Sequence, residues 1–297
     1  MEKTINHSTG RENKLNIPKI NAVMRLGNAE YKYNSWIFSS KSQHIKADDH
    51  NSYIVKFKNN PQGTRILANE LVASSIAKLI NVPCPEFSII NVNAGLVDYI
   101  NKINSTNFAP GNQFASRYLP SKDMLSNEIS NASNIYDWSK VIIFENLIQN
   151  QDFDKKHILL YIDKKDKKMK FCVIDHGCAF KNQNWTALKP KNIQNNIENL
   201  LYNNNLKYIR SIKSAKKNIL NRIFNNITDT FKLKQNEIKE IINIPVLDEW
   251  GIDSNQKEAM ALYMLSFSRN TTKLIEMLRR IVWANDRFKK QNQEQQI

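Results

Sequence analysis

The chain has few of the residues that build disulfide frameworks, and it lacks long apolar stretches. Its 297 residues include only three cysteines, with no CxxC pair among them. This odd count argues against a disulfide-rich secreted domain and against a cysteine zinc site. No apolar run approaches the roughly 20 residues that span a bilayer, and the polar start lacks the apolar stretch of a secretory signal. We therefore expect a soluble, cytoplasmic protein with no membrane partner.

Acidic residues are also in short supply. The chain has 28 acidic and 43 basic side chains, which gives a formal net charge of +15. That balance permits anionic partners such as a nucleotide, a nucleic acid or an acidic surface. However, the lysines are scattered, and no nucleic-acid-binding motif accompanies them. We therefore expect a solvated basic surface and no nucleic-acid partner.

The hydrophobic pattern divides the chain into a β-rich part and a helical part. Residues 1–16 are polar and expected to be disordered. Residues 17–120 carry short strand patterns and one helix, from about Arg65 to Ile80. Residues 121–297 are mostly helical, and a buried helix, Trp138–Ile148, precedes a single β-hairpin. Because strands and helices do not alternate, the pattern predicts an α+β fold with a small β-rich N-lobe and a larger helical C-lobe.

The hydrophobic pattern also predicts individual strands, one loop and an interrupted helix. The segments IFSSKSQHI and YIVKFK flank a polar turn and predict a hairpin. The strand PEFSIINV is expected to lead into a polar loop, INSTNFAPGNQ, before another strand, FASRYL. The last helix, about Gln256 to Lys290, is expected to be interrupted near Ser268–Asn270.

Two aspartates flank the hairpin of the second half. Asp152 lies in the polar loop NQDFDKKH, and Asp175 ends the strand MKFCVID. A loop carboxylate before a hairpin and a second one after it is how a protein-kinase-like site is built. The first orients or deprotonates the attacking hydroxyl, and the second holds Mg²⁺ on the ATP phosphates. Each aspartate alone also fits an ordinary turn.

A lysine and a glutamate in the first half complete such a site. Lys56 lies in the middle of the strand YIVKFK, on the same face as Ile54. A lysine there is costly to bury unless it is paired. Glu70 falls on the inward stripe of the next helix and is the candidate partner. A strand lysine with a helix glutamate is the pair that grips the ATP phosphates in kinases, although an edge strand with a solvated lysine fits the pattern too.

The order of these motifs resembles the HipA-like kinase family, in particular its single-chain bacterial branch. The segments that carry the likeness are SSKSQHI, YIVKFK, LANELVASSIAKLINVPCPE, GNQFASRYL, NQDFDKKHILL and CVIDHGCAF, with a weaker match in LYMLSFSRNTTKLIEML. They extend from about Ile17 to Leu278. The resemblance implies a two-lobed kinase with ATP and Mg²⁺ in its cleft and a protein substrate, and it leaves room for a regulatory partner protein.

The resemblance also implies a role for each matching residue. Lys56 would contact the ATP phosphates, Glu70 would orient Lys56, and Asp152 would be the catalytic base. Asp175 would bind the metal. The phosphate-covering loop would be Ser39–His44, which supplies Ser40, Ser42 and Gln43 to the cofactor site. The adenine-contacting hinge would be Arg117, Tyr118 and Leu119.

Two positions depart from the family pattern. Phe153 stands where the family has an arginine after the catalytic aspartate, and His157 stands where it has a metal-binding asparagine. A carboxamide oxygen suits Mg²⁺, whereas an imidazole prefers metals such as Mn²⁺ or Zn²⁺. We therefore expect His157 to join Asp175 at the metal, with either an altered metal preference or weakened activity. Asp154 could supply a further carboxylate.

Four functions remain open at this point. The main interpretation is an ATP-dependent Ser/Thr protein kinase, with a small-molecule acceptor as a variant. A nucleotide-binding pseudokinase or scaffold is the first alternative, because of Phe153 and His157. A metal-dependent hydrolase is a further alternative; it would use Asp152, Asp154, His157 and Asp175, but it lacks the additional His or Asp ligands of a two-metal site. A basic nucleic-acid-binding module is the last alternative.

Overall fold

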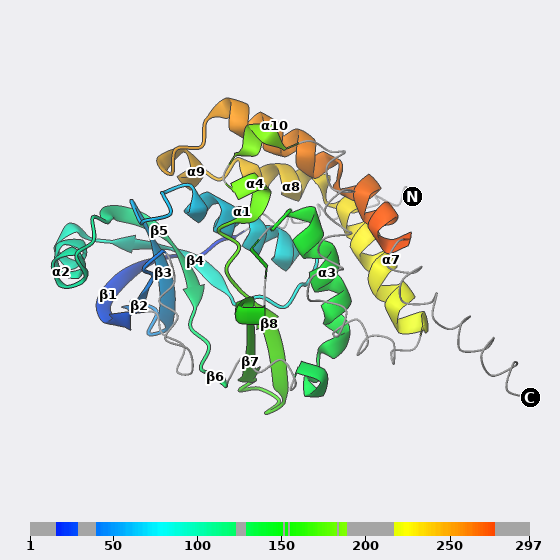
Figure 1. Cartoon of the computed structure of the whole chain (residues 1–297), viewed down its shortest axis with the longest axis horizontal. Helices are drawn as coiled ribbons and strands as arrows, with labels where there is room; N and C mark the ends of the chain where they lie inside the picture. Colours follow the sequence, from blue (N-terminus) through cyan, green and yellow to red (C-terminus); the bar gives the residue numbers. More distant parts are fainter. Residues whose placement is uncertain are drawn as a thin grey trace, which may run out of the picture.

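The described chain combines a β-barrel, a small β-sheet and a set of helices (Figure 1). The structure is a computed structural model, and it describes residues 16–28, 40–122, 129–150, 152–153, 155–182, 184–188 and 217–276. The predicted disorder of residues 1–15, as well as Ser39 and Asp154, lies outside the described residues. No described helix is long and apolar enough to cross a membrane.

Five strands close into the barrel. They are β1 (Lys19–Asn28), β2 (Gln43–Ala47), β3 (Ser52–Lys58), β4 (Phe87–Val92) and β5 (Ala109–Arg117). Their order is β1-β2-β3-β5-β4, and a parallel pairing of β1 with β4 closes the barrel. Along β3, Tyr53, Val55 and Phe57 fill the interior. Because side chains alternate along a strand, Ile54 and Lys56 face the opposite side, toward the rest of the chain.

Helix α1 (Ile66–Leu79) packs against the outside of the barrel. Twelve of its 14 residues are buried, because β3 and β5 lie on one side of it and α4 and α8 on another. This is the helix predicted for Arg65–Ile80, and the pattern located it to within one residue at each end. Its burial on most sides places Asn69 and Glu70 at the junction of the barrel with the second half of the chain.

The predicted hairpin of the second half is present. Strand β7 (Ile158–Ile162) pairs antiparallel with β8 (Met169–Val173), and the short strand β6 (Ser121–Lys122) pairs with β7. The helix before the hairpin, α3 (Trp138–Leu147), is buried as expected. Together these elements fix the ends of the hairpin that carry Asp152 and Asp175.

Helices make up most of the rest of the described chain. They are α4 (Ala179–Asn182), α7 (Lys217–Leu233), α8 (Gln235–Ile242), α9 (Val246–Glu249) and α10 (Ser254–Leu265), with short 3₁₀ turns at Ile129–Asn131, Ile135–Asp137, Lys155–His157 and Trp185–Ala187. The largest hydrophobic cluster joins α1 to α3, the hairpin and these helices. A second cluster fills the barrel. The fold is thus mixed α and β, with its strands concentrated in the first half.

One prediction about the chain path was wrong. The segment read as a polar loop contributes to helix α2 (Ala94–Asn104) and to the first half of β5. Only Val97 and Ile100 of α2 are buried, so its apolar signal is short, and Asn93 starts the helix by capping it. The interruption expected near Ser268–Asn270 is confirmed, since the last helix is interrupted at Ser266.

Candidate active site

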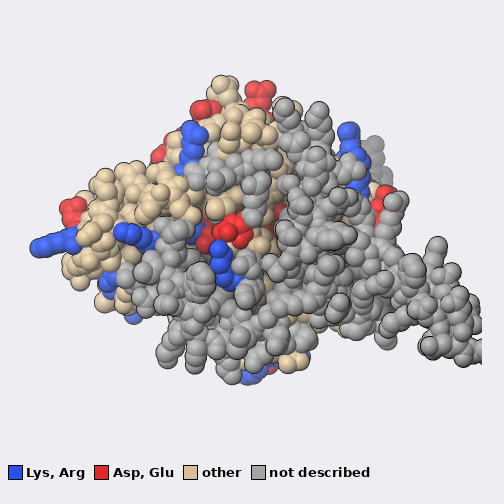
Figure 2. Space-filling view, viewed as in Figure 1, with Lys and Arg blue, Asp and Glu red and all other residues tan. Residues whose placement is uncertain are grey.

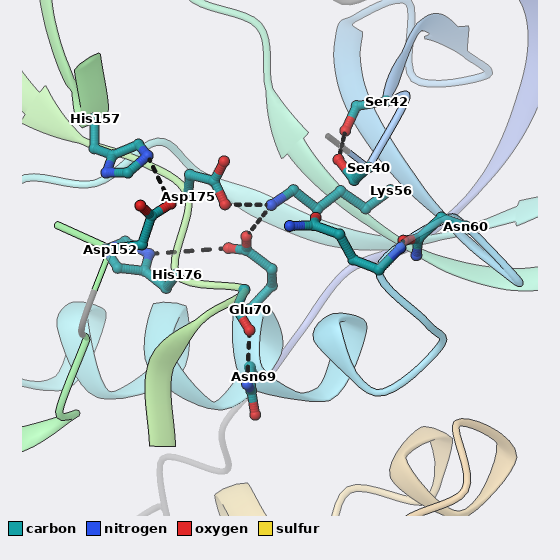
Figure 3. A network of polar contacts seen from close by, with 12 residues as sticks. Ser40, Ser42, Lys56, Asn60, Asn69, Glu70, Asp152, His157, Asp175 and His176 are labelled. Carbon is teal, nitrogen blue, oxygen red and sulfur yellow. Dashed lines mark hydrogen bonds and ion pairs between the residues drawn. The ribbon is translucent and has the colours of Figure 1, made fainter. Parts of the chain in front are cut away.

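Lys56 lies between two carboxylates that come from distant parts of the chain. Its ammonium forms an ion pair with Glu70 of α1, and it lies 2.6 Å from Oδ1 of Asp175, just after β8 (Figure 3). The Lys56 side chain is 8% exposed and the Glu70 side chain 4%. The predicted Lys56–Glu70 pair is therefore present, and Asp175 joins it. A lysine buried at this depth is stabilised only because both carboxylates face it.

The three charges alter one another's protonation. Burial alone would lower the pKa of Lys56, but Asp175 and Glu70 raise it well above its usual range. Burial alone would raise the pKa of Asp175, but the Lys56 ammonium lowers it well below its usual range. Lys56 is therefore a cation and Asp175 an anion at neutral pH. The site presents both a positive group for phosphate oxygens and a negative group for a metal.

The turn that follows β8 holds Asp175 in an uncommon backbone conformation. Asp175 has a φ of 64°, in the left-handed region, which aspartate tolerates better than most residues. Gly177 follows, and a Cβ at this position would lie 3.5 Å from both Lys56 Nζ and Glu70 Oε1. A Cβ there would make ordinary van der Waals contact, so the turn passes close beside the ion pair.

His176, between these two residues, belongs to a polar network that the sequence did not reveal. Its Nε2 lies 3.3 Å from Oε1 of Glu145 on α3, and its Nδ1 lies 3.9 Å from Oε2 of Glu70. All three side chains are buried. Burial opposes the charged form, but Glu145 raises the pKa of His176 above its ordinary value. Glu145 gave no signal in the sequence, because it lies in an almost wholly buried helix with no periodic polar face.

Asp152 lies in a more open setting. Its side chain is 51% exposed, Lys156 Nζ lies 3.3 Å from its Oδ1, and His157 Nε2 lies 3.8 Å from its Oδ2. His157 itself is buried, and this burial lowers its pKa despite the nearby Asp175 and Asp152 carboxylates. The Asp152 and Asp175 charges both act on His157, so the three form one electrostatic group, and Figure 3 shows their side chains close together. Asp152 is the most exposed member of this group.

Phe153, the first departure from the family pattern, packs as an aromatic residue. Its ring lies 6.2 Å from that of Trp138 and 6.4 Å from that of His157, centroid to centroid. It adjoins the largest hydrophobic cluster. Phe153 thus helps to bury His157, so the two departures from the family pattern are in contact with each other.

The residues predicted for the phosphate-covering loop separate into two groups. Ser40 and Ser42 are buried, and their hydroxyls lie 2.8 Å apart. Ser42 lines the same pocket as Lys56 and Asp175. Gln43 instead accepts hydrogen bonds from Arg25 and Asn104, so its amide anchors the start of β2 to β1 and α2.

The residues predicted for the hinge lie at the end of β5. Arg117 pairs with Glu86 at 2.9 Å and lines a pocket that adjoins that of Lys56. The Tyr118 ring lies 4.3 Å from that of His44 on β2. Leu119 packs against the small apolar cluster beneath the hairpin. Tyr118 and Leu119 thus lie between β2 and the hairpin, whereas the Arg117 guanidinium is bound by Glu86.

The donor atoms around Asp175 fit a magnesium or manganese ion that keeps other ligands. Oδ1 of Asp175 faces Lys56, and Figure 3 shows its second oxygen directed away from the lysine. Among the described residues, no three His, Cys, Asp or Glu side chains form a group that could hold a metal ion by themselves. Mg²⁺ commonly binds through one or two carboxylates, substrate phosphates and water, so a single carboxylate with His157 nearby is compatible with such an ion.

The surface charge does not suggest a different kind of site. On the face shown in Figure 2, the described Lys and Arg side chains are spread over the molecule and do not form a single patch. This matches the scattered lysines of the sequence.

A strand lysine paired with a helix glutamate, and an aspartate after a hairpin, define a protein of the kinase class. The model of the HipA-like kinase family matches residues 39–273, which is more than half of the chain. The chain therefore belongs to the HipA-like kinase family. The resemblance noted from the motifs is confirmed, and the chain is a kinase-type phosphotransferase.

Solved structures resemble the chain in fold. A Helicobacter pylori proinflammatory kinase, CtkA, aligns with a TM-score of 0.51 and 12% identity, covering 89% of this chain and 99% of its own. The Golgi casein kinase with Mn/ADP bound aligns with a TM-score of 0.42 and 11% identity, covering 87% and 73%. At such identities the CtkA likeness concerns the fold alone. No curated protein matches the chain.

Proposed function

We propose that the chain is a two-lobed, ATP-dependent protein kinase that phosphorylates serine or threonine hydroxyls. The barrel with α1, within residues 17–120, would form the N-lobe. Residues 121–297, with the hairpin and the later helices, would form the C-lobe. ATP would bind between them, over Lys56 and between Tyr118 and the hairpin.

The observation that carries this proposal is the position of Lys56 between Glu70 and Asp175. These residues come from β3, α1 and the turn after β8, so only the assembled fold brings them together. Burying three charges is costly, and a purely structural role could be filled at less cost by apolar residues of similar size. A buried, shared lysine is what phosphate binding requires, because it can stay oriented by Glu70 while phosphate oxygens approach.

Asp152 is the proposed catalytic base. Its exposure leaves room for a hydroxyl to approach from outside, and its carboxylate would orient that hydroxyl and accept its proton during transfer. The phosphoryl bond to ADP would break as the bond to the hydroxyl oxygen forms. A metal ion held by Asp175, with His157 close by, would neutralise charge on the phosphates.

Transfer of label from ATP tests the proposal. We expect the wild-type protein to label itself or a protein in a lysate, and Asp152→Asn and Asp175→Asn to abolish the labelling. Asp163 of the β7–β8 turn offers a matched control, because it is partly exposed like Asp175 and also pairs with a lysine, Lys170, but lies outside the site. Asp163→Asn should label normally. Equal labelling by all four proteins would refute the assignment of the two aspartates.

A second candidate is a nucleotide-binding scaffold with little or no transfer. It is favoured by one observation, the contact of Phe153 with His157 where the family has an arginine and an asparagine. The scaffold would be supported over the enzyme by three results together. The wild-type protein would bind ATP, Lys56→Met would bind it more weakly, and neither Mg²⁺ nor Mn²⁺ would allow transfer of its phosphate.

A further inference from the structure

A single buried asparagine ties the turn after Asp175 to helix α1. Asn69 is fully buried and directly precedes Glu70. Its Nδ2 donates hydrogen bonds to the carbonyl oxygens of Gly177, at 2.7 Å, and Ala179, at 2.8 Å. Its Oδ1 accepts a hydrogen bond from Nε1 of Trp185, also at 2.7 Å. The amide thus uses both of its donor hydrogens and its oxygen.

Trp185 fixes which way this amide points. An indole N–H can only donate a hydrogen bond, so the oxygen of Asn69 must face it and the NH₂ group must face the turn. The indole is itself held by its surroundings: it is fully buried, packs edge-on against Phe180, and lies in a 3₁₀ turn that contacts α10. The helical part of the chain therefore determines the orientation of a side chain on α1.

The turn held by Asn69 needs such support. Asp175 and Phe180 both have positive φ angles, 64° and 54°. For a bulky residue such as phenylalanine this conformation is a clear outlier, and it persists only where the surroundings impose it. The Gly177 and Ala179 carbonyls lie between these two residues in the chain. The hydrogen bonds from Asn69 therefore hold the strained turn at two points.

We propose that Asn69 is a positioning residue, and that the Trp185–Asn69 hydrogen bond holds Asp175 and Glu70 around Lys56 at the same time. The inference rests on the proposed kinase function. Since Asn69 precedes Glu70 and binds the turn that follows Asp175, a loss of its bonds releases Asp175 from Lys56 without touching either residue. Asn69 and Trp185 themselves have no role in the chemistry.

Trp185→Phe is the sharpest test, because it keeps an aromatic ring and removes only the N–H. It leaves Oδ1 of Asn69 buried without its partner, which is costly enough to populate a released turn. We expect kcat to fall about tenfold while KM for ATP changes by less than about twofold, since the released form still binds the nucleotide. The control is Trp250→Phe, which removes an indole hydrogen bond to the Asn112 carbonyl of β5.

Asn69→Asp separates the two sides of the amide. It keeps an acceptor for Trp185 but replaces the donors that hold the Gly177 and Ala179 carbonyls. We expect a larger fall in kcat than in Trp185→Phe. In the double variant with Trp185→Phe, the fold-decrease in kcat should be smaller than the product of the two single fold-decreases, because both changes break the same connection.

Hydrogen exchange gives a readout that needs no activity. The backbone N–H of Ala179 donates a hydrogen bond to the His176 carbonyl, and that of Phe180 donates one to the Ile148 carbonyl. They should exchange at least several-fold faster in Trp185→Phe and Asn69→Asp, but at the wild-type rate in Trp250→Phe. Normal exchange and an unchanged kcat in Trp185→Phe would overturn the inference. If the wild-type protein transfers no phosphate but these amides still respond, the proposed function fails while the positioning contact stands.

Discussion

The two ends of the candidate site are built differently. At one end, Lys56 lies in direct contact with Glu70 and Asp175, which come from separate elements; the Lys56 and Glu70 side chains are buried and that of Asp175 is 23% exposed. At the other end, Asp152 is half-exposed, and the Lys156 ammonium and the His157 imidazole lie 3.3 and 3.8 Å away from it. One end is assembled before any ligand arrives, whereas the other is open to the solvent.

This difference matches the tasks proposed for the two ends. ATP is the same molecule in every turnover, so its phosphates can be met by groups that are fixed in advance, at the cost of burying charge. A protein substrate brings its own hydroxyl and must enter and leave, so the base that meets it stays accessible. We therefore expect mutations at the buried end to affect both stability and transfer, and mutations at the open end to affect transfer alone.

Lys56→Met should have the largest effect. It leaves Glu70 and Asp175 buried without their cation, and breaking such a buried pair costs about 3 kcal/mol or more of unfolding free energy. Phosphate transfer should be lost as well. Urea denaturation measures the first effect and labelled ATP the second. Adding Glu70→Gln should restore part of the stability, since one uncompensated charge is removed, but no activity.

Lys170→Met is the matched control for this comparison. Lys170, near the start of β8, also lies between two aspartates, Asp163 at 2.5 Å and Asp166 at 2.9 Å, but its side chain is 26% exposed, whereas that of Lys56 is 8% exposed. Solvent screens such a pair, so stability should hardly change. If both lysine variants lost stability equally, burial would not be what distinguishes the cleft.

Asp152→Asn should affect transfer alone. Removing a general base commonly lowers kcat by roughly 10²- to 10⁴-fold. Because the Asp152 side chain is 51% exposed, its loss should leave the urea midpoint and the affinity for ATP as in the wild type. A large loss of stability would contradict the view that this end is open.

The sequence was sufficient to predict the Lys56–Glu70 pair, because both residues follow simple periodicities. Lys56 shares a strand face with Ile54, and Glu70 falls on the inward stripe of a helix, so each position could be placed locally. The pairing of Lys56 with Asp175 joins residues more than a hundred positions apart. That contact was not predicted, because no local pattern encodes it; the order of motifs in the family implied only that both residues belong to one ATP site.

Other parts of the site could not be predicted for the same reason. Asn69 and Trp185 look like ordinary helix and turn residues until the fold brings them to 2.7 Å. Gln43 was assigned to the cofactor by its place in the loop, whereas its amide binds Arg25 and Asn104. Side-chain direction near a strand end depends on neighbours that are distant in sequence, so position alone did not settle it.

His157→Asn should have a smaller effect, on the choice of metal. A carboxamide oxygen suits Mg²⁺, and an imidazole favours Mn²⁺. We expect the ratio of activity with Mg²⁺ to activity with Mn²⁺ to rise several-fold in this variant. The exposed His50, in the β2–β3 turn, provides the control, since His50→Asn should leave the ratio unchanged. An identical ratio in all three proteins would remove His157 from the metal site.

Lys156→Met should have the smallest effect on kcat, and it tests whether Asp152 is held less firmly than Asp175. The Lys156–Asp152 pair is 3.3 Å long, with side chains 39% and 51% exposed, so solvent and salt already screen it. We expect kcat to change by less than about twofold at low salt, and the difference from wild type to disappear near 1 M salt, where screening acts over about 3 Å. A loss that is large and independent of salt would mean that Asp152 is held as firmly as Asp175. The open end would then be preassembled like the buried one, and substrate entry would have to be explained by motion of the surrounding chain instead of by the exposure of the base.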